Sequence, residues 1–279
     1  MTDLGDVRIQ RTGPEPPDEP ASRRRLAIVL AGIAILAAIG GGYLFFRASP
    51  DTDAVRTETA QVVEPGTPGT RLPAEPGENI VLPPLEESDA LVRELVARLS
   101  SHPRVAAWLT TDQLVRNFTV VVLNIAEGRT PATHLRKIAP SGAFLVIQDG
   151  STARIDPRSF QRYDGHAAAV SAIDARGAAR LYATLKPRID DAYKELGAPH
   201  GDFDRTLERA IAHLLQTPVR QGPVALKPAP AGYAFSDPAL ESLSGAQRQL
   251  LRMGPANVRL VQDKLREVAE HLGFAPATR

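Results

Sequence analysis

The longest hydrophobic run in the chain covers residues 26–46, which read LAIVLAGIAILAAIGGGYLFF without a charged residue or a proline. As a helix rising about 1.5 Å per residue, this run spans about 30 Å, the thickness of a bilayer's hydrocarbon core. The sequence Arg23-Arg24-Arg25 directly precedes it. By the positive-inside rule, we expect a single-pass inner-membrane protein with a cytoplasmic N-terminus and a periplasmic C-terminal domain.

Two further readings of this run bear on function. A cleaved signal peptide has a shorter apolar region, about 7–15 residues, followed by small residues at a cleavage site. The long run followed by Arg47-Ala48-Ser49 fits that pattern poorly. The small residues Ala38 and Gly42 lie four positions apart and are compatible with pairing of spanning helices. A structural protein that associates through this helix is therefore one possible function class.

The segments on both sides of the run are polar and rich in proline. Residues 1–22 predict a disordered cytoplasmic tail, and residues 48–84 predict a flexible stalk. Such segments bury too little apolar surface to offset the conformational entropy lost on folding. We expect residues 85–274 to form the extracytoplasmic domain.

Helical periodicity begins at Leu85. Apolar residues recur at spacings of three and four in the first and last helices of the domain. They are Leu91, Val92, Leu95, Val96 and Leu99 in the first, and Val258, Val261, Leu265, Val268 and Leu272 in the last. Between them, the run that ends at Gly128 is apolar around most of its circumference, which predicts a core helix. Thr110 and Gln113 have the spacing of a capping box at its start.

Further helices are predicted over residues 157–173, 175–196 and 203–215, with Pro187 expected to kink or divide the second. Short apolar runs on both sides of Asp149-Gly150 predict a β-hairpin, and residues 223–236 predict a second hairpin or a loop. The expected fold class is mainly α: a helical domain with one or two small β-hairpins, preceded by the transmembrane helix and the proline-rich stalk.

The amino-acid composition excludes several classes of function for this protein. The formal net charge is +1 and only 5% of residues are aromatic, which argues against a nucleic-acid partner. The chain has no cysteine, so it forms no disulfide and has no thiol nucleophile. The usual local signatures of hydrolases, zinc proteases and phosphate-binding loops are also missing from the sequence.

Five polar residues are candidates for ligand binding. They are Asn124, Glu127, Asp156, Asp164 and His166. The first two share one face of the apolar core helix, where buried polar groups need partners, and Arg136 or Lys137 could supply one. The other three place carboxylates near a histidine, which is a combination suited to acid–base chemistry. Each also has a structural interpretation, either as a hydrogen-bonding stripe or as a helix cap.

Two sets of charged residues surround the long predicted helix. His200, Asp202 and Asp204 alternate and could offer ligands to a divalent metal, but an aspartate capping the next helix is the favoured interpretation, so we expect no metal and no cofactor. We also expect structural ion pairs around Pro187, formed by Lys186, Arg180 and Asp190.

Several long segments resemble a family of bacterial envelope proteins, domain-of-unknown-function family 3014. They include SSHPRVAAWL (100–109), NIAEGRTPATHL (124–135), IDPRSFQRYD (155–164), LYATLKPRIDDAYKELG (181–197) and residues 235–269. The resemblance implies a membrane anchor with a proline-rich spacer. It implies no activity, ligand or catalytic residue.

The sequence thus predicts a membrane-anchored periplasmic binding module of the cell envelope. Its expected partners are the lipid bilayer, through residues 26–46, and either another envelope protein or wall material. The alternative is a periplasmic hydrolase that uses Asp, Glu or His side chains without a local motif.

Overall fold

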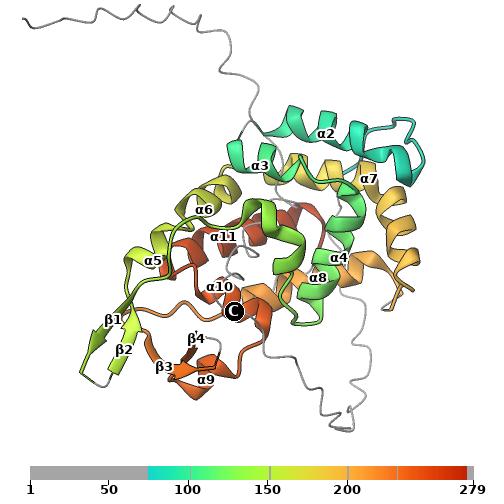
Figure 1. Cartoon of the computed structure of the whole chain (residues 1–279). Coiled ribbons are helices and arrows are strands. Elements are labelled where there is room, and N and C mark those ends of the chain that lie inside the picture. The colour runs from blue at the N-terminus through green and yellow to red at the C-terminus, as the bar shows by residue number, and fades with distance from the viewer. Residues whose placement is uncertain (1–74, 101, 151, 200, 231, 275–279) are drawn as a thin grey trace, which may run out of the picture.

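The computed structural model describes residues 75–274 apart from 101, 151, 200 and 231. This part of the chain is mainly helical, with a small antiparallel sheet at one end (Figure 1). The helices are η3 (Leu85–Glu87), α2 (Ser88–Leu99), α3 (Pro103–Trp108), α4 (Leu114–Ala126), η4 (Ala132–Ile138), α5 (Arg158–Gln161), α6 (Asp164–Ser171), α7 (Ala175–Glu195), α8 (Phe203–Leu215), α9 (Pro238–Glu241), α10 (Gly245–Leu251) and α11 (Pro255–His271). The strands are β1 (Val146–Asp149), β2 (Thr152–Ile155), β3 (Ala225–Ala229) and β4 (Gly232–Phe235).

Helix α4 lies at the centre of the larger hydrophobic core, as its apolar circumference predicts. Its Leu114, Val122 and Ile125 side chains are completely buried. Helices α2, α7 and α8 pack against it. Burying each such side chain contributes roughly 1.5–3 kcal/mol. The single helix predicted over residues 157–173 is instead two helices, α5 and α6.

The two predicted hairpins join into one sheet with the strand order β1-β2-β3-β4. Strands β2 and β3 pair antiparallel, with Ala153 opposite Leu226, and this pairing links segments about seventy residues apart. Ile155, Leu226 and Phe235 from the sheet pack with Leu240 and Leu251 in a second, smaller hydrophobic cluster. A hairpin alone is marginally stable, so joining the two gives each a partner and a shared core.

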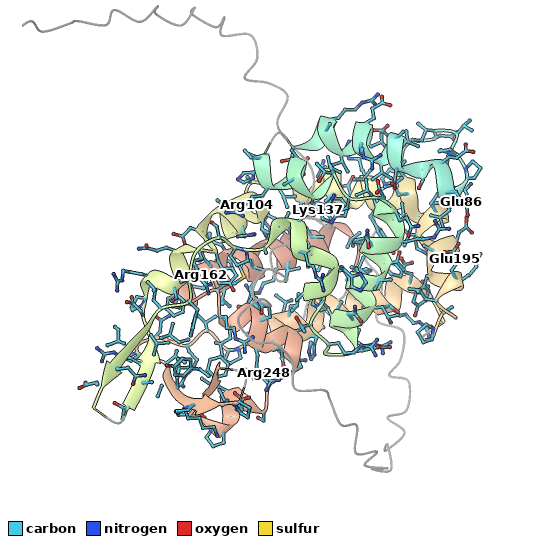
Figure 2. The ribbon with its side chains drawn as sticks, in the orientation of Figure 1. Glu86, Arg104, Lys137, Arg162, Glu195 and Arg248 are labelled. Atoms are coloured by element: carbon cyan, nitrogen blue, oxygen red, sulfur yellow. The ribbon has the colours of Figure 1, made fainter. Side chains whose placement is uncertain are left out.

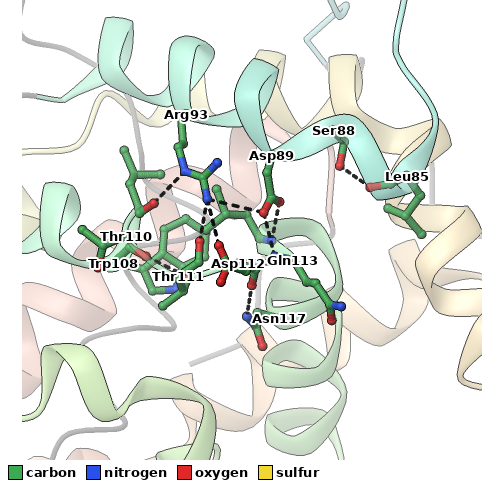
Figure 3. A network of polar contacts seen from close by, with 12 residues as sticks. Leu85, Ser88, Asp89, Arg93, Trp108, Thr110, Thr111, Asp112, Gln113 and Asn117 are labelled. Atoms are coloured by element: carbon green, nitrogen blue, oxygen red, sulfur yellow. Dashed lines mark hydrogen bonds and ion pairs between the residues drawn. The ribbon is translucent and has the colours of Figure 1, made fainter.

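The N-terminus of α4 is capped by a different helix, so the predicted capping box is wrong. The Asp89 carboxylate of α2 accepts hydrogen bonds from the backbone N–H groups of Gln113, at 2.7 Å, and Leu114, at 2.8 Å (Figure 3). Thr110 instead donates its hydroxyl to the carbonyl of Ala107. A carboxylate at this position satisfies free N–H groups and complements the positive end of the helix dipole.

Residues 75–82, which we call the strap, lie across α7. The backbone N–H of Glu78 donates to Thr184 Oγ1 at 2.8 Å. A Cβ atom on Gly77 would lie 2.6 Å from the backbone nitrogen of Thr184, so only glycine allows this approach. Pro187 lies inside α7 and does not divide it. The last part of the segment predicted as stalk therefore contacts the helical domain.

The expected tail (1–22), the apolar run 26–46 and most of the expected stalk lie outside the described residues. Within the described ranges, no helix combines the length and the apolar character needed to cross a bilayer.

Candidate functional site

A surface cavity of about 260 Å³ lies between the strap, α7, the start of α8 and the end of α11. Its apolar lining consists of Ala179, Ala183, Leu272 and Phe274. Its polar lining consists of Glu75, Tyr182, Lys186, Asp204 and His271. An apolar surface with a few convergent polar groups is the usual composition of a small-ligand site.

Lys186 is the centre of the charged groups on the α8 side of the cavity. Its Nζ atom lies 2.5 Å and 2.7 Å from the two carboxylate oxygens of Asp190. Asp204 and Asp202 lie 3.7 Å and 3.9 Å from the same nitrogen. Three carboxylates therefore surround one ammonium group, which leaves this side of the cavity with an excess of negative charge. The Lys186–Asp190 part of the predicted ion-pair set is confirmed, whereas Arg180 pairs with Glu75 instead.

Tyr182 connects the apolar part of the cavity to this charged cluster. Its hydroxyl donates a hydrogen bond to the Asp204 carboxylate, and its ring stacks on Phe203 with centroids 6.4 Å apart. Burial, and secondly the hydrogen bond to Asp204, raises the pKa of the Tyr182 hydroxyl well above its ordinary value. The hydroxyl therefore stays protonated and holds the Asp204 carboxylate in place.

Glu75 binds the strap to the opposite side of the cavity. Its carboxylate lies 3.1 Å from Arg176 Nε, 3.9 Å from Arg180 Nε and 3.6 Å from His271 Nδ1. Its backbone N–H also donates to the carbonyl of His271 at 3.2 Å. These contacts bring residues from the start of the domain, from α7 and from the end of α11 to one point.

The start of α8 confirms the capping interpretation of the Asp202 region. The Asp202 side chain accepts a hydrogen bond from the backbone N–H of Asp204 at 2.7 Å and so serves as the N-cap. His200 lies outside the described residues. Over the ranges that the structure covers, no group of three or more potential ligands from His, Asp and Glu is arranged to hold a metal ion.

Asn124 and Glu127 lie together near the C-terminal end of α4, and both contact Arg129. Arg129 Nε donates to Asn124 Oδ1 at 3.2 Å, and Arg129 also forms an ion pair with Glu127. The partner is thus Arg129, not the suggested Arg136 or Lys137. Neither residue lines the cavity.

Asp156 caps the turn that leads into α5. It accepts hydrogen bonds from the backbone N–H of Arg158, at 2.9 Å, and from Arg158 Nη2, at 2.6 Å. The hydrogen bonds from Arg158 lower the pKa of the Asp156 carboxyl. Asp164 accepts from Asn257 Nδ2 at 2.9 Å, which connects α6 to α11.

His166 is buried, with only 2% of its surface exposed. Its Nε2 atom lies 2.6 Å from the carbonyl oxygen of Ile138 and 3.0 Å from Arg104 Nη1. Burial lowers the pKa of His166 below its ordinary 6.5, so the imidazole is neutral at pH 7. Of the five residues selected from the sequence, Asn124 and Glu127 share one partner while the other three have different partners, and none of the five lines the cavity.

Sequence reasoning missed Glu75, Tyr182 and His271 as members of a site. Glu75 falls in the segment predicted as stalk, and the other two sit on ordinary amphipathic helices. The one local signal was the spacing of Lys186 and Asp190, four residues apart on a helix.

Comparison with known proteins gives a family without an assigned activity. No curated protein and no solved structure matches the chain. A family model described as "Protein of unknown function (DUF3014)" matches residues 114–269, from α4 to the last turns of α11. This match covers more than half of the 279 residues and confirms the predicted resemblance. The chain belongs to domain-of-unknown-function family 3014.

Proposed function

We propose that this protein is a binding module of the bacterial cell envelope, anchored in the inner membrane with its helical domain in the periplasm. The observation that carries the binding role is the cavity of about 260 Å³ under the strap, which combines an apolar lining with fixed charged groups. The uncharged run 26–46 behind three arginines supports the anchor and its orientation.

The charges of the cavity favour a ligand that carries an amine. Asp204 lines the cavity, and Asp190 and Asp202 lie beside it against the same Lys186 ammonium, so three negative charges stand against one positive charge on this side. A primary ammonium group from a ligand would reduce this excess, while an attached apolar group would contact Leu272 and Phe274. Wall peptides and lysine-bearing segments of envelope proteins both have this chemistry.

Site-specific photocrosslinking in intact cells tests the binding role. A photoreactive phenylalanine analogue replaces Tyr182 in the cavity, and the matched control carries it at Tyr233 on β4, which is also half-buried. We expect an adduct of defined mass from position 182 that is absent from position 233 and weaker in an Asp204→Asn background. The same adducts from both positions, or none from position 182, would contradict the proposal.

A periplasmic hydrolase is the second candidate, and one observation favours it. The Glu75 carboxylate lies 3.6 Å from His271 Nδ1 at the edge of the cavity, and a carboxylate can orient a histidine as a general base. A hydrolase would release a cleaved product from wall peptides in a His271-dependent manner. A binding module would retain the peptide unchanged, and mass spectrometry of the bound fraction separates the two.

A further inference from the structure

Four cations gather on the side of the domain formed by α3, η4 and the α5–α6 junction, which we call the basic face. They are Arg104, Arg136, Lys137 and Arg162. Figure 2 shows Arg104 beside Lys137 and Arg162 further toward the sheet, with Glu86 and Glu195 at the opposite end of the view. Contacts confirm that these elements adjoin, because His166 on α6 lies 3.0 Å from Arg104 and 2.6 Å from the carbonyl that follows Lys137.

The cations of the basic face contact neutral groups. Lys137 Nζ donates to the carbonyl of Thr110 at 2.7 Å. Arg162 Nη1 donates to the carbonyl of Gly142 at 3.3 Å. Within the described part of the chain, none of the four forms an ion pair, and the nearby Asp164 is hydrogen-bonded to Asn257. Their positive charge is therefore not neutralised by the described residues.

Two of the arginines are held in place by their surroundings. The Arg162 guanidinium lies 5.6 Å and 5.4 Å from the ring centroids of Phe144 and Tyr163, and its Nε donates to Ser159 O at 3.0 Å. Arg104 packs over Gly165, where a Cβ atom would lie 2.8 Å from Arg104 Nε. Guanidinium groups with fixed positions lose little entropy when they bind phosphate oxygens in a forked geometry.

We propose that the basic face docks on anionic phospholipid headgroups of the membrane that holds residues 26–46. This inference rests on the membrane anchor of the proposed function. Residues 47–74 lie between the run and the strap in the sequence, and the flexible stalk predicted for them would reach on the order of 30 Å at that length. Such a tether keeps the domain at an effective concentration in the millimolar range at its own membrane. Each cation near an anionic surface then raises the docked population roughly fivefold.

The absence of cysteine in the chain allows a single reporter to be placed at will. Ser141→Cys, exposed in the loop beside Arg162, carries a donor fluorophore, and the bilayer carries an acceptor on its headgroups. The full-length protein is reconstituted in nanodiscs of phosphatidylcholine alone or mixed equally with phosphatidylglycerol. Leu196→Cys serves as the control for reporter position, because Leu196 is exposed and adjoins Glu195, which Figure 2 shows at the end of the molecule opposite Arg162.

We expect phosphatidylglycerol to increase energy transfer from position 141 several-fold more than from position 196, and high salt to remove the increase. This increase in energy transfer should be abolished in a variant that combines four substitutions: Arg104→Gln, Arg136→Gln, Lys137→Gln and Arg162→Gln. A matched variant with four exposed cations changed to Gln elsewhere, at Arg205, Arg209, Lys227 and Arg259, should retain it. If the fourfold variant unfolds, the Arg136→Gln/Lys137→Gln pair tests the same point and should lower the docked population by more than tenfold.

The possible failures are distinguishable. A chain that does not remain with the nanodisc refutes the anchor and with it the proposed function. A chain that inserts but gives equal transfer in both lipids, or equal loss in both fourfold variants, refutes only the docking. If soluble polyphosphate binds the basic face while phosphatidylglycerol has no effect, the partner is a soluble polyanion and the lipid proposal is wrong.

Discussion

The cavity and the basic face differ in what their positively charged side chains contact. Around the cavity, Lys186, Arg176 and Arg180 each face carboxylates from another part of the chain. On the basic face, Arg104 and Arg162 lie against imidazole, aromatic rings and backbone carbonyls. The first arrangement joins the strap, α7, α8 and α11 to one another. The second leaves positive charge for a partner outside the described domain, so the first should contribute more to folding stability than the second.

The largest contrast should come from the same substitution in both regions. Lys186→Met leaves two half-buried carboxylates, Asp190 and Asp204, and the exposed Asp202 without their shared cation. We expect a loss of about 2 kcal/mol, since removing one partner of a fully buried pair costs about 3–5 kcal/mol and this cluster is only partly buried. Lys137→Met should change the free energy of unfolding by less than about 0.5 kcal/mol. Urea denaturation of both variants measures the difference. An equal loss of unfolding free energy in both variants would show that the two lysines contribute equally to folding stability.

The strap provides the next largest effect. Gly77→Val would force a side chain into the backbone of α7 and should weaken strap docking by about 1–3 kcal/mol. The amide of Glu78, which donates to Thr184, should then exchange its hydrogen faster while amides in α4 keep their protection. Val81→Ala, at a position 95% exposed, is the control and should leave exchange unchanged.

Acidification should destabilise the basic-face side through its histidines. Burial lowers the pKa of His166, and burial followed by the Arg104 charge lowers that of His102. Because the unfolded chain binds these protons more readily, stability is complete above pH 6.5 and declines as the pH falls below that value. The expected loss is on the order of 1 kcal/mol after allowance for solvent screening.

Urea midpoints across a pH series measure this loss. Arg104→Gln should reduce it, since the arginine charge contributes to the lowered pKa of both histidines. A midpoint that rises on acidification would contradict the assignment.

The smallest effect belongs to an exposed ion pair outside both regions. Arg129→Gln removes the contacts with Asn124 and Glu127 at the end of α4. Because the Arg129 side chain is 63% exposed, we expect a loss of under about 0.5 kcal/mol by thermal or urea unfolding. A larger loss would indicate that exposed pairs in this domain stabilise as strongly as the cavity cluster does.

Local features of the domain followed from the sequence. The aspartate cap predicted before the helix over residues 203–215 forms at Asp202. Asp174 and Asp237 cap their helices in the same way, and Ser244 forms a capping box with Gln247. Each involves groups within three residues of one another, so the sequence contains both partners side by side. The apolar face of α11 was equally visible, because a period of 3.6 residues follows from the helix itself.

The candidate site was only partly visible, and the fold explains why. The Lys186–Asp190 pair lies within one helix, whereas the contact of Glu75 with His271 joins opposite ends of the described domain. Asp156, Asp164 and His166 are close in sequence, yet the turns between β2, α5 and α6 direct them to different partners. Nearness along the chain therefore did not predict a shared site.

The sequence by itself determined the mainly helical class, the central position of α4, the first hairpin and the family to which the chain belongs, while it left residues 223–236 as either a hairpin or a loop. Only the tertiary structure decided that the hairpins share one sheet, that Asp89 caps α4, that the strap lies on α7 and that the cavity and the basic face exist. The physical reason is how far apart in the sequence the interacting residues lie. Periodicity and capping depend on interactions within a few residues, while these later features depend on which distant surfaces meet when the core is buried.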